Sequence, residues 1–151
     1  MNESMPVAPA LVAAILSMLA AQAIKPFWVM LSERRLDWRR AFDTGGMPSS
    51  HTSLVTTLTI AIGVQEGVQS SMFAVALVFS GYFVFEATGL RQEVGHQARV
   101  LNEMIEEFVS EHAMHVDAQR LRELVGHTWS EVLGGVVVGV LVFLACRPWW
   151  S

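Results

Sequence analysis

The feature that most constrains the fold is a run of 21 residues, 4–24, that contains no Asp, Glu, Lys or Arg. As an α-helix this run would be about 31 Å long, close to the hydrocarbon thickness of a bilayer. It therefore predicts a first transmembrane helix. A cleaved signal peptide is the competing interpretation. It is disfavoured because residues 1–24 hold no Lys or Arg to form a positively charged leading region.

Further apolar segments follow the first. Residues 67–85 and 132–146 are uncharged, and the second of these ends at Arg147, Pro148 and a pair of tryptophans, as bilayer interfaces favour. Residues 52–65 are either a short spanning helix or the first arm of a re-entrant hairpin. Only 16% of the residues are charged, against about 25% in soluble domains, and mean hydropathy is +0.41.

These segments predict an all-α integral membrane helical bundle with about four transmembrane helices plus an amphipathic, interfacial helix. We expect one membrane-embedded domain over residues 1–151. A soluble bundle of unusually apolar helices is the alternative. The single cysteine, Cys146, excludes an intramolecular disulfide.

The amphipathic helix is predicted within residues 91–126, along or just outside the membrane, because apolar positions recur at three- and four-residue spacing between glutamates. The apolar positions are Val94, Ala98, Leu101, Ile105, Phe108 and Val109. Four side chains of metal-ligating type lie here, Glu111, His112, His115 and Asp117. Their spacing supports no closed site, so a solvated loop is favoured and no metal is expected.

Basic residues indicate an orientation. Eight of the ten lie in the two longer connections, the first holding Arg34, Arg35, Arg39 and Arg40 and the second holding Arg91, Arg99, Arg120 and Arg122. With four spans these connections share a side, which the positive-inside rule assigns to the cytoplasm. Both termini are then expected outside, in a bacterial-type plasma membrane or its organelle equivalent.

Two strings carry candidate chemistry. GGMPSSHTS, at residues 45–53, places hydroxyls and His51 where a loop becomes an apolar helix, and the unpaired N–H groups of a helix start favour an anion such as phosphate. GHTWSEV, at residues 126–132, places His127 and Glu131 four apart on one helical face. A carboxylate on one imidazole nitrogen leaves the other as a base or nucleophile, although an interfacial hydrogen bond is the simpler interpretation.

Together with EATGLRQEVGHQARVLN at residues 86–102, these strings resemble the divergent family within the type 2 phosphatidic acid phosphatase and vanadium-dependent haloperoxidase superfamily. The resemblance runs from about Gln22 and Lys25 to Gly139. It implies a helical membrane phosphatase that cleaves lipid phosphates through a phosphohistidine intermediate, without metal or another cofactor.

Residue by residue, the resemblance implies that His127 attacks phosphorus, Glu131 orients it and His51 protonates the leaving alkoxide. The implied phosphate-binding residues are Lys25, Ser49, Ser50, Arg91 and Arg122, the last two being alternatives for one duty. The sequence departs from the superfamily pattern in having Ser50 for glycine, Glu131 for aspartate, Leu121 for arginine, and Ser32 and Glu33 for Arg-Pro. Lys25 could instead extend along its helix to the interface, and an ion pair is favoured for Glu86.

A cytoplasmic site at the bilayer surface would meet lipid phosphates of the inner leaflet. Among these we rank phosphatidylglycerophosphate first as the expected substrate, followed by polyprenyl diphosphate and phosphatidic acid. Gly81, Gly134, Gly135 and Gly139 suit close helix packing, and the spacing from Gly135 to Gly139 lets helices or subunits approach. A homodimer packed through the glycine-bearing faces is therefore a further expectation. Nucleic acid is not an expected partner. The alternative function is a catalytically silent membrane protein that binds anionic lipid or a protein partner through the same basic face.

Overall fold

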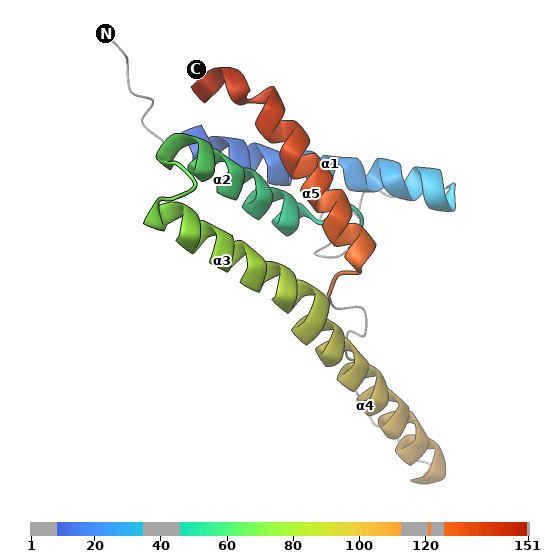
Figure 1. The fold of residues 1–151 in the computed structure, drawn as a ribbon. Helices are drawn as coiled ribbons and strands as arrows, with labels where there is room; N and C mark the ends of the chain where they lie inside the picture. The colour runs from blue at the N-terminus through green and yellow to red at the C-terminus, as the bar shows by residue number, and fades with distance from the viewer. Residues whose placement is uncertain (1–8, 35–45, 113–120, 122–125, 151) are drawn as a thin grey trace.

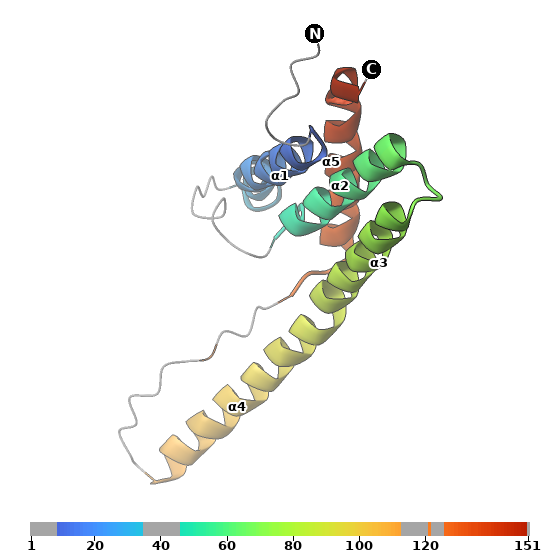
Figure 2. The ribbon, with the colours of Figure 1, turned by 90° about the vertical axis from the view of Figure 1, so that its left-hand side faces the viewer.

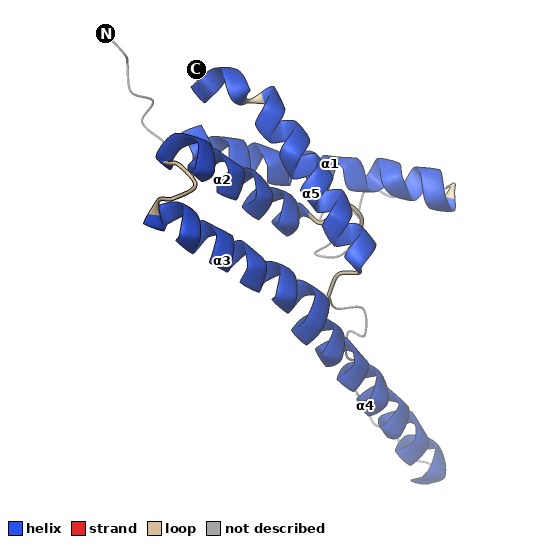
Figure 3. Ribbon diagram, in the orientation of Figure 1, coloured by secondary structure: helices blue, strands red, loops and turns tan. Residues whose placement is uncertain are grey.

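The protein is an all-α membrane helical bundle, as its sequence predicts. The computed structural model describes residues 9–34, 46–112, 121 and 126–150, and within them every regular element is helical (Figure 3). The elements are α1 (Pro9–Glu33), α2 (Ser50–Glu66), α3 (Ser71–Phe85), a π-helical turn η2 (Glu86–Leu90), α4 (Arg91–His112), α5 (Trp129–Ala145) and a 3-10 turn η3 (Arg147–Trp150).

Helix α2 is at the centre of the bundle and packs against α1, α3 and α5, while α1 also packs against α5 (Figures 1 and 2). At one end, Ala10 of α1, Ala61 of α2 and Phe143 of α5 form a buried apolar cluster. This cluster joins the start of α1 to the last turns of α2 and α5. Helices α2 and α5 therefore run in the same direction and α1 runs against them, so α1 begins where α5 ends.

The buried face of α2 is polar. It consists of hydroxyl side chains with one valine and one alanine: Ser50, Thr52, Ser53, Val55, Thr57, Thr59 and Ala61. The Thr57 hydroxyl donates to the carbonyls of Ser53 (3.0 Å) and Gly139 (2.9 Å), and Thr59 shares a hydrogen bond of 2.7 Å with Ser80 of α3. Such interhelical bonds join helices where no water competes.

Helices α2 and α5 approach closely because α5 presents glycines to α2. A Cβ added at Gly135 would lie 2.5 Å from the Ser49 carbonyl oxygen, and one at Gly139 would lie 2.7 Å from that of Ser53. These two glycines, expected to serve helix or subunit packing, are used within a single chain. Their face is covered by α2, so it does not provide the surface of the expected homodimer. Gly81 of α3 has open space in front of its Cβ position.

The helix predicted within residues 91–126 is present as α4. Helix α4 continues the direction of α3 through the π turn, and the two make one long rod that extends beyond the bundle (Figures 1 and 2). The segments long and apolar enough to cross a membrane are Pro9–Ser32 and Ser71–Val109 within the described residues, with Trp129–Ala145 as a shorter apolar helix. None of the residues of α3 is buried, so its surface suits contact with lipid.

Candidate active site

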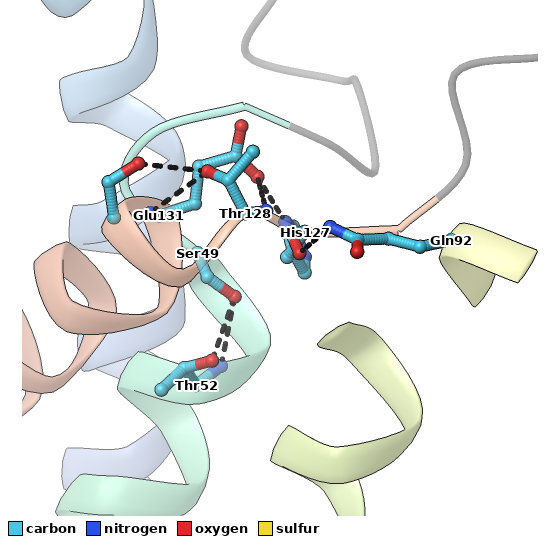
Figure 4. Close-up of polar contacts among 7 residues, drawn as sticks. Ser49, Thr52, Gln92, His127, Thr128 and Glu131 are labelled. Carbon is cyan, nitrogen blue, oxygen red and sulfur yellow. Dashed lines mark hydrogen bonds and ion pairs between the residues drawn. The ribbon is translucent and has the colours of Figure 1, made fainter. Parts of the chain in front are cut away.

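Ser49 caps the start of α2 and connects it to α5 (Figure 4). Its hydroxyl accepts hydrogen bonds from the Thr52 N–H (3.3 Å) and the Thr52 hydroxyl (3.0 Å), as a serine N-cap does. Its own N–H donates to the carbonyl of Glu131 at 3.0 Å. Ser49 and Ser50 are both buried. The loop that precedes α2 is therefore fixed against the first turn of α5.

His127 and Glu131 form the central pair of the site. The imidazole Nδ1 lies 2.8 Å from Glu131 Oε2, and the side chains are 5% and 19% exposed. A carboxylate can only accept, so Nδ1 carries the proton and Nε2 keeps its lone pair in the neutral ring. The i, i+4 spacing predicts this contact, and the structure brings the two side chains together.

Thr128 holds the carboxylate of Glu131 through a capping box at the start of α5. The Thr128 hydroxyl accepts from the Glu131 N–H at 3.4 Å, and Glu131 Oε2 accepts from the Thr128 N–H at 3.2 Å. The single oxygen Oε2 of Glu131 thus accepts hydrogen bonds from both the Thr128 N–H at the helix start and the His127 imidazole. Thr128 is a residue that the sequence analysis missed, although a threonine three residues before a glutamate and an apolar run is the usual signature.

Helix register brings the two strings to one end of the bundle. The approaches of Gly135 to Ser49 and of Gly139 to Ser53 keep α2 and α5 level with each other. His51, in the first turn of α2 and partly buried, therefore lies at the same end as His127 and Glu131.

Lys25 belongs to the same end by a similar argument. Ser17 of α1 is hydrogen-bonded to Ser53 of α2, and the two helices are antiparallel. Lys25 lies eight residues after Ser17, about 12 Å further along α1, which is the level of the loop before α2. Its side chain is only 2% exposed. Lys25 is thus buried in the bundle rather than extended to water, which disfavours the interfacial interpretation.

Other expected residues are less well placed or not described. Arg91 begins α4, but its side chain is outside the described part, and Arg122 lies outside the described residues altogether. Glu86 begins the π turn. Among the described residues no group of three His, Cys, Asp or Glu side chains could hold a metal ion. His115 and Asp117, and the side chains of Glu111 and His112, lie outside that description.

The backbone of His127 is held by the turn between α3 and α4, which the sequence analysis did not foresee. The His127 N–H donates to the carbonyl of Ala87 in η2 at 2.8 Å. The Gln92 side-chain Nε2 donates to the His127 carbonyl at 2.8 Å (Figure 4). These partners are 35 or more residues away from His127 in the sequence, so no local sequence pattern predicts the contacts.

Fold and site together define a class: a small all-α membrane protein with a histidine–carboxylate pair beside a capped, serine-containing helix start. The family model described as "Divergent PAP2 family" matches residues 7–142. The chain belongs to this divergent PAP2 family.

A relative is known in Bacillus subtilis (strain 168), the "Uncharacterized membrane protein YuiD". It is 36% identical over 143 residues, which cover 89% of this chain and 90% of the relative. Its name supports the membrane setting and assigns no reaction. No solved structure matches the chain.

Proposed function

We propose that the protein is a membrane lipid-phosphate phosphatase that works through a phosphohistidine at His127, the whole chain acting as one membrane-embedded domain. The observation that carries this proposal is the 2.8 Å contact between His127 Nδ1 and Glu131 Oε2, held beside the buried Ser49 loop. Membership of the divergent PAP2 family adds support. The pair gives an imidazole whose second nitrogen is available as a nucleophile.

In the first step His127 Nε2 attacks phosphorus, the bond from phosphorus to the lipid oxygen breaks, and His51 gives its proton to the leaving alkoxide. The carboxylate of Glu131 stabilises the positive charge that the ring of His127 acquires. In the second step neutral His51 takes a proton from water, which attacks phosphorus and releases inorganic phosphate and His127. Atoms and charges balance over the two steps, and both histidines return to their starting states.

Phosphoryl transfer needs the charge on the phosphoryl oxygens to be neutralised. Lys25 is a buried cation at this end of the bundle, and Arg91 or Arg122 would supply the second positive charge. The start of α2, at Ser49 and Ser50, is a helix end where anions are favoured, although the Ser49 N–H itself already donates to the Glu131 carbonyl. This set fits a phosphate that carries two negative charges.

Phosphatidylglycerophosphate ranks first as the substrate, followed by polyprenyl diphosphate and phosphatidic acid. The ranking follows from the proposed orientation. Eight of the ten basic residues lie in the two longer connections, which precede Ser49 and His127 in the chain, and the positive-inside rule assigns these connections to the cytoplasm. A site on that face meets lipid phosphates of the inner leaflet.

The test is release of phosphate from a panel of these lipids in detergent micelles. Wild type should turn over one lipid in excess chelator, vanadate should inhibit, and His127→Gln and His51→Gln should each lower kcat by at least about 100-fold. Turnover that persists without both histidines would refute the mechanism. Lipid binding by wild type and by His127→Gln alike, with no turnover in either, would instead support the silent lipid-binding protein.

A further inference from the structure

The turn between α3 and α4 has a geometry that the proposed chemistry does not yet use. Two hydrogen bonds, each of 2.8 Å, hold the peptide groups on either side of His127: the Ala87 carbonyl accepts from its N–H, and Gln92 Nε2 donates to its carbonyl. Both partners come from one short stretch of the rod. The backbone of His127 is thus fixed at two points and its ring at a third, by Glu131.

Gly126 makes this docking sterically feasible. Its φ is +105°, a conformation that side-chain-bearing residues rarely adopt. A Cβ at this position would lie 3.0 Å from the Gln92 backbone nitrogen and 3.1 Å from the Ala87 carbonyl oxygen. Gly126 therefore lies directly against the rod.

The accepting carbonyl belongs to a π-helical turn, the kind of helix irregularity that is frequent at functional sites. This turn separates the lipid-exposed α3 from α4 and lies beside the candidate nucleophile. The EATGLRQ string, residues 86–92, therefore has a structural role. Its first five residues form the π turn, and its last residue, Gln92, donates to the His127 carbonyl.

We propose that Gln92 is a positioning residue, which together with the Ala87 carbonyl fixes the His127 backbone so that the imidazole meets phosphorus in line. The proposal rests on the proposed function of His127. Gln92 acts on the histidine peptide and not on the substrate. Its loss therefore lowers kcat and leaves KM nearly unchanged, because fewer molecules hold the reactive geometry while substrate contacts remain.

The expected effect is that of a single hydrogen bond. Gln92 is exposed on the rod, so water competes for its amide, and removing the bond should lower kcat about three- to tenfold.

Gln92→Leu removes the donor at all pH values. Gln92→Glu also removes it at neutral pH, but a protonated carboxyl regains an O–H donor, so the kcat of Gln92→Glu relative to wild type should rise as pH falls from 7 toward 5. That of Gln92→Leu should stay flat. Gln97→Glu, an exposed glutamine of the same helix, is the matched control and should match wild type.

Hydrogen exchange of the segment 121–132, followed by mass spectrometry, is the second measurement and needs no activity. Faster exchange in both Gln92 variants, with the kcat losses and the acid recovery above, supports the proposal. Unchanged kcat in Gln92→Leu while wild-type turnover depends on His127, or a loss confined to KM, overturns it. Absence of wild-type turnover overturns the proposed function and with it the positioning role. In that case, faster exchange in the Gln92 variants would show that the Gln92 contact only stabilises the structure around His127. Unchanged exchange would show that the contact has no structural role either.

Discussion

The close approach of α2 and α5 gives the sharpest prediction, since three glycines of one helix meet different neighbours. A Cβ at Gly135 would lie 2.5 Å from the Ser49 carbonyl oxygen and 2.8 Å from Thr52 Cβ, whereas one at Gly134 would meet only the Met47 and Pro48 side chains, at 3.2 Å and beyond. The Met47 side chain is flexible and can move aside. The backbone at Ser49 cannot, because it caps α2 and donates to Glu131.

Gly135→Ala must therefore separate the helices by about 0.9 Å to restore an ordinary contact near 3.4 Å. Overpacking of this size costs about 1–3 kcal/mol, or about 2–4 °C in melting temperature for each kcal/mol. A displacement of about 1 Å in a catalytic group can cost about 100-fold in rate. The separation opens directly between the Ser49 loop and Glu131, so we expect activity to fall by about that factor.

Gly139→Ala meets the Ser53 carbonyl at 2.7 Å, so it should lose similar stability. It lies about 6 Å further from the site along α5, so its activity loss should be smaller. Melting temperature in detergent and phosphate release on the preferred lipid provide the two readouts. If Gly135→Ala is as stable and as active as Gly134→Ala, the close approach does not hold the site together and the reasoning is wrong.

Three further predictions concern the start of α5 and the orientation. Glu131→Gln should keep the melting temperature within about 2 °C, because an amide oxygen still accepts from Thr128, yet lose at least about 100-fold in kcat with the lost negative charge; equal activity would show that the charge is not needed. Thr128→Val should lower the free energy of unfolding by about 1 kcal/mol through loss of the N-cap, measured by denaturant titration in mixed micelles, and no change would contradict the capping box. A reporter enzyme that is active only outside the cell, fused after the last residue, should be active, whereas a cytoplasmic signal would reverse the proposed orientation.

The elements most visible in the sequence were those with local signals. The uncharged runs predicted the apolar helices. The GGMPSSHTS string predicted a helix start, and the i, i+4 pair His127 and Glu131 predicted a side-chain contact. These features depend on residues within one helical turn of each other. Local spacing is sufficient for such cases.

Features that depend on helix register were not visible. Nothing in the sequence indicates that Gly135 and Gly139 face α2 rather than a second subunit, because small-residue spacing serves both. Likewise, Gln92 is one glutamine among several polar residues of α4, and its link to His127 requires the path of the whole intervening chain. The direction of α4 also escaped prediction, because amphipathic periodicity describes a face and not an axis.

The hydroxyl-rich buried face of α2 has a consequence for biogenesis. Unlike Pro9–Ser32 and Ser71–Val109, α2 is not among the described helices apolar enough to enter a bilayer on their own account. Its acceptors and partners lie on α1, α3 and α5, and the Gly139 carbonyl that accepts from Thr57 is synthesised 82 residues later. Until α5 is made, Thr57 has only the Ser53 carbonyl of its own helix as an acceptor, and part of the polar face of α2 lacks its final interhelical partners. A nascent chain stalled before α5 should be recognised and degraded by membrane quality-control proteases, although three of its four bundle helices are already made.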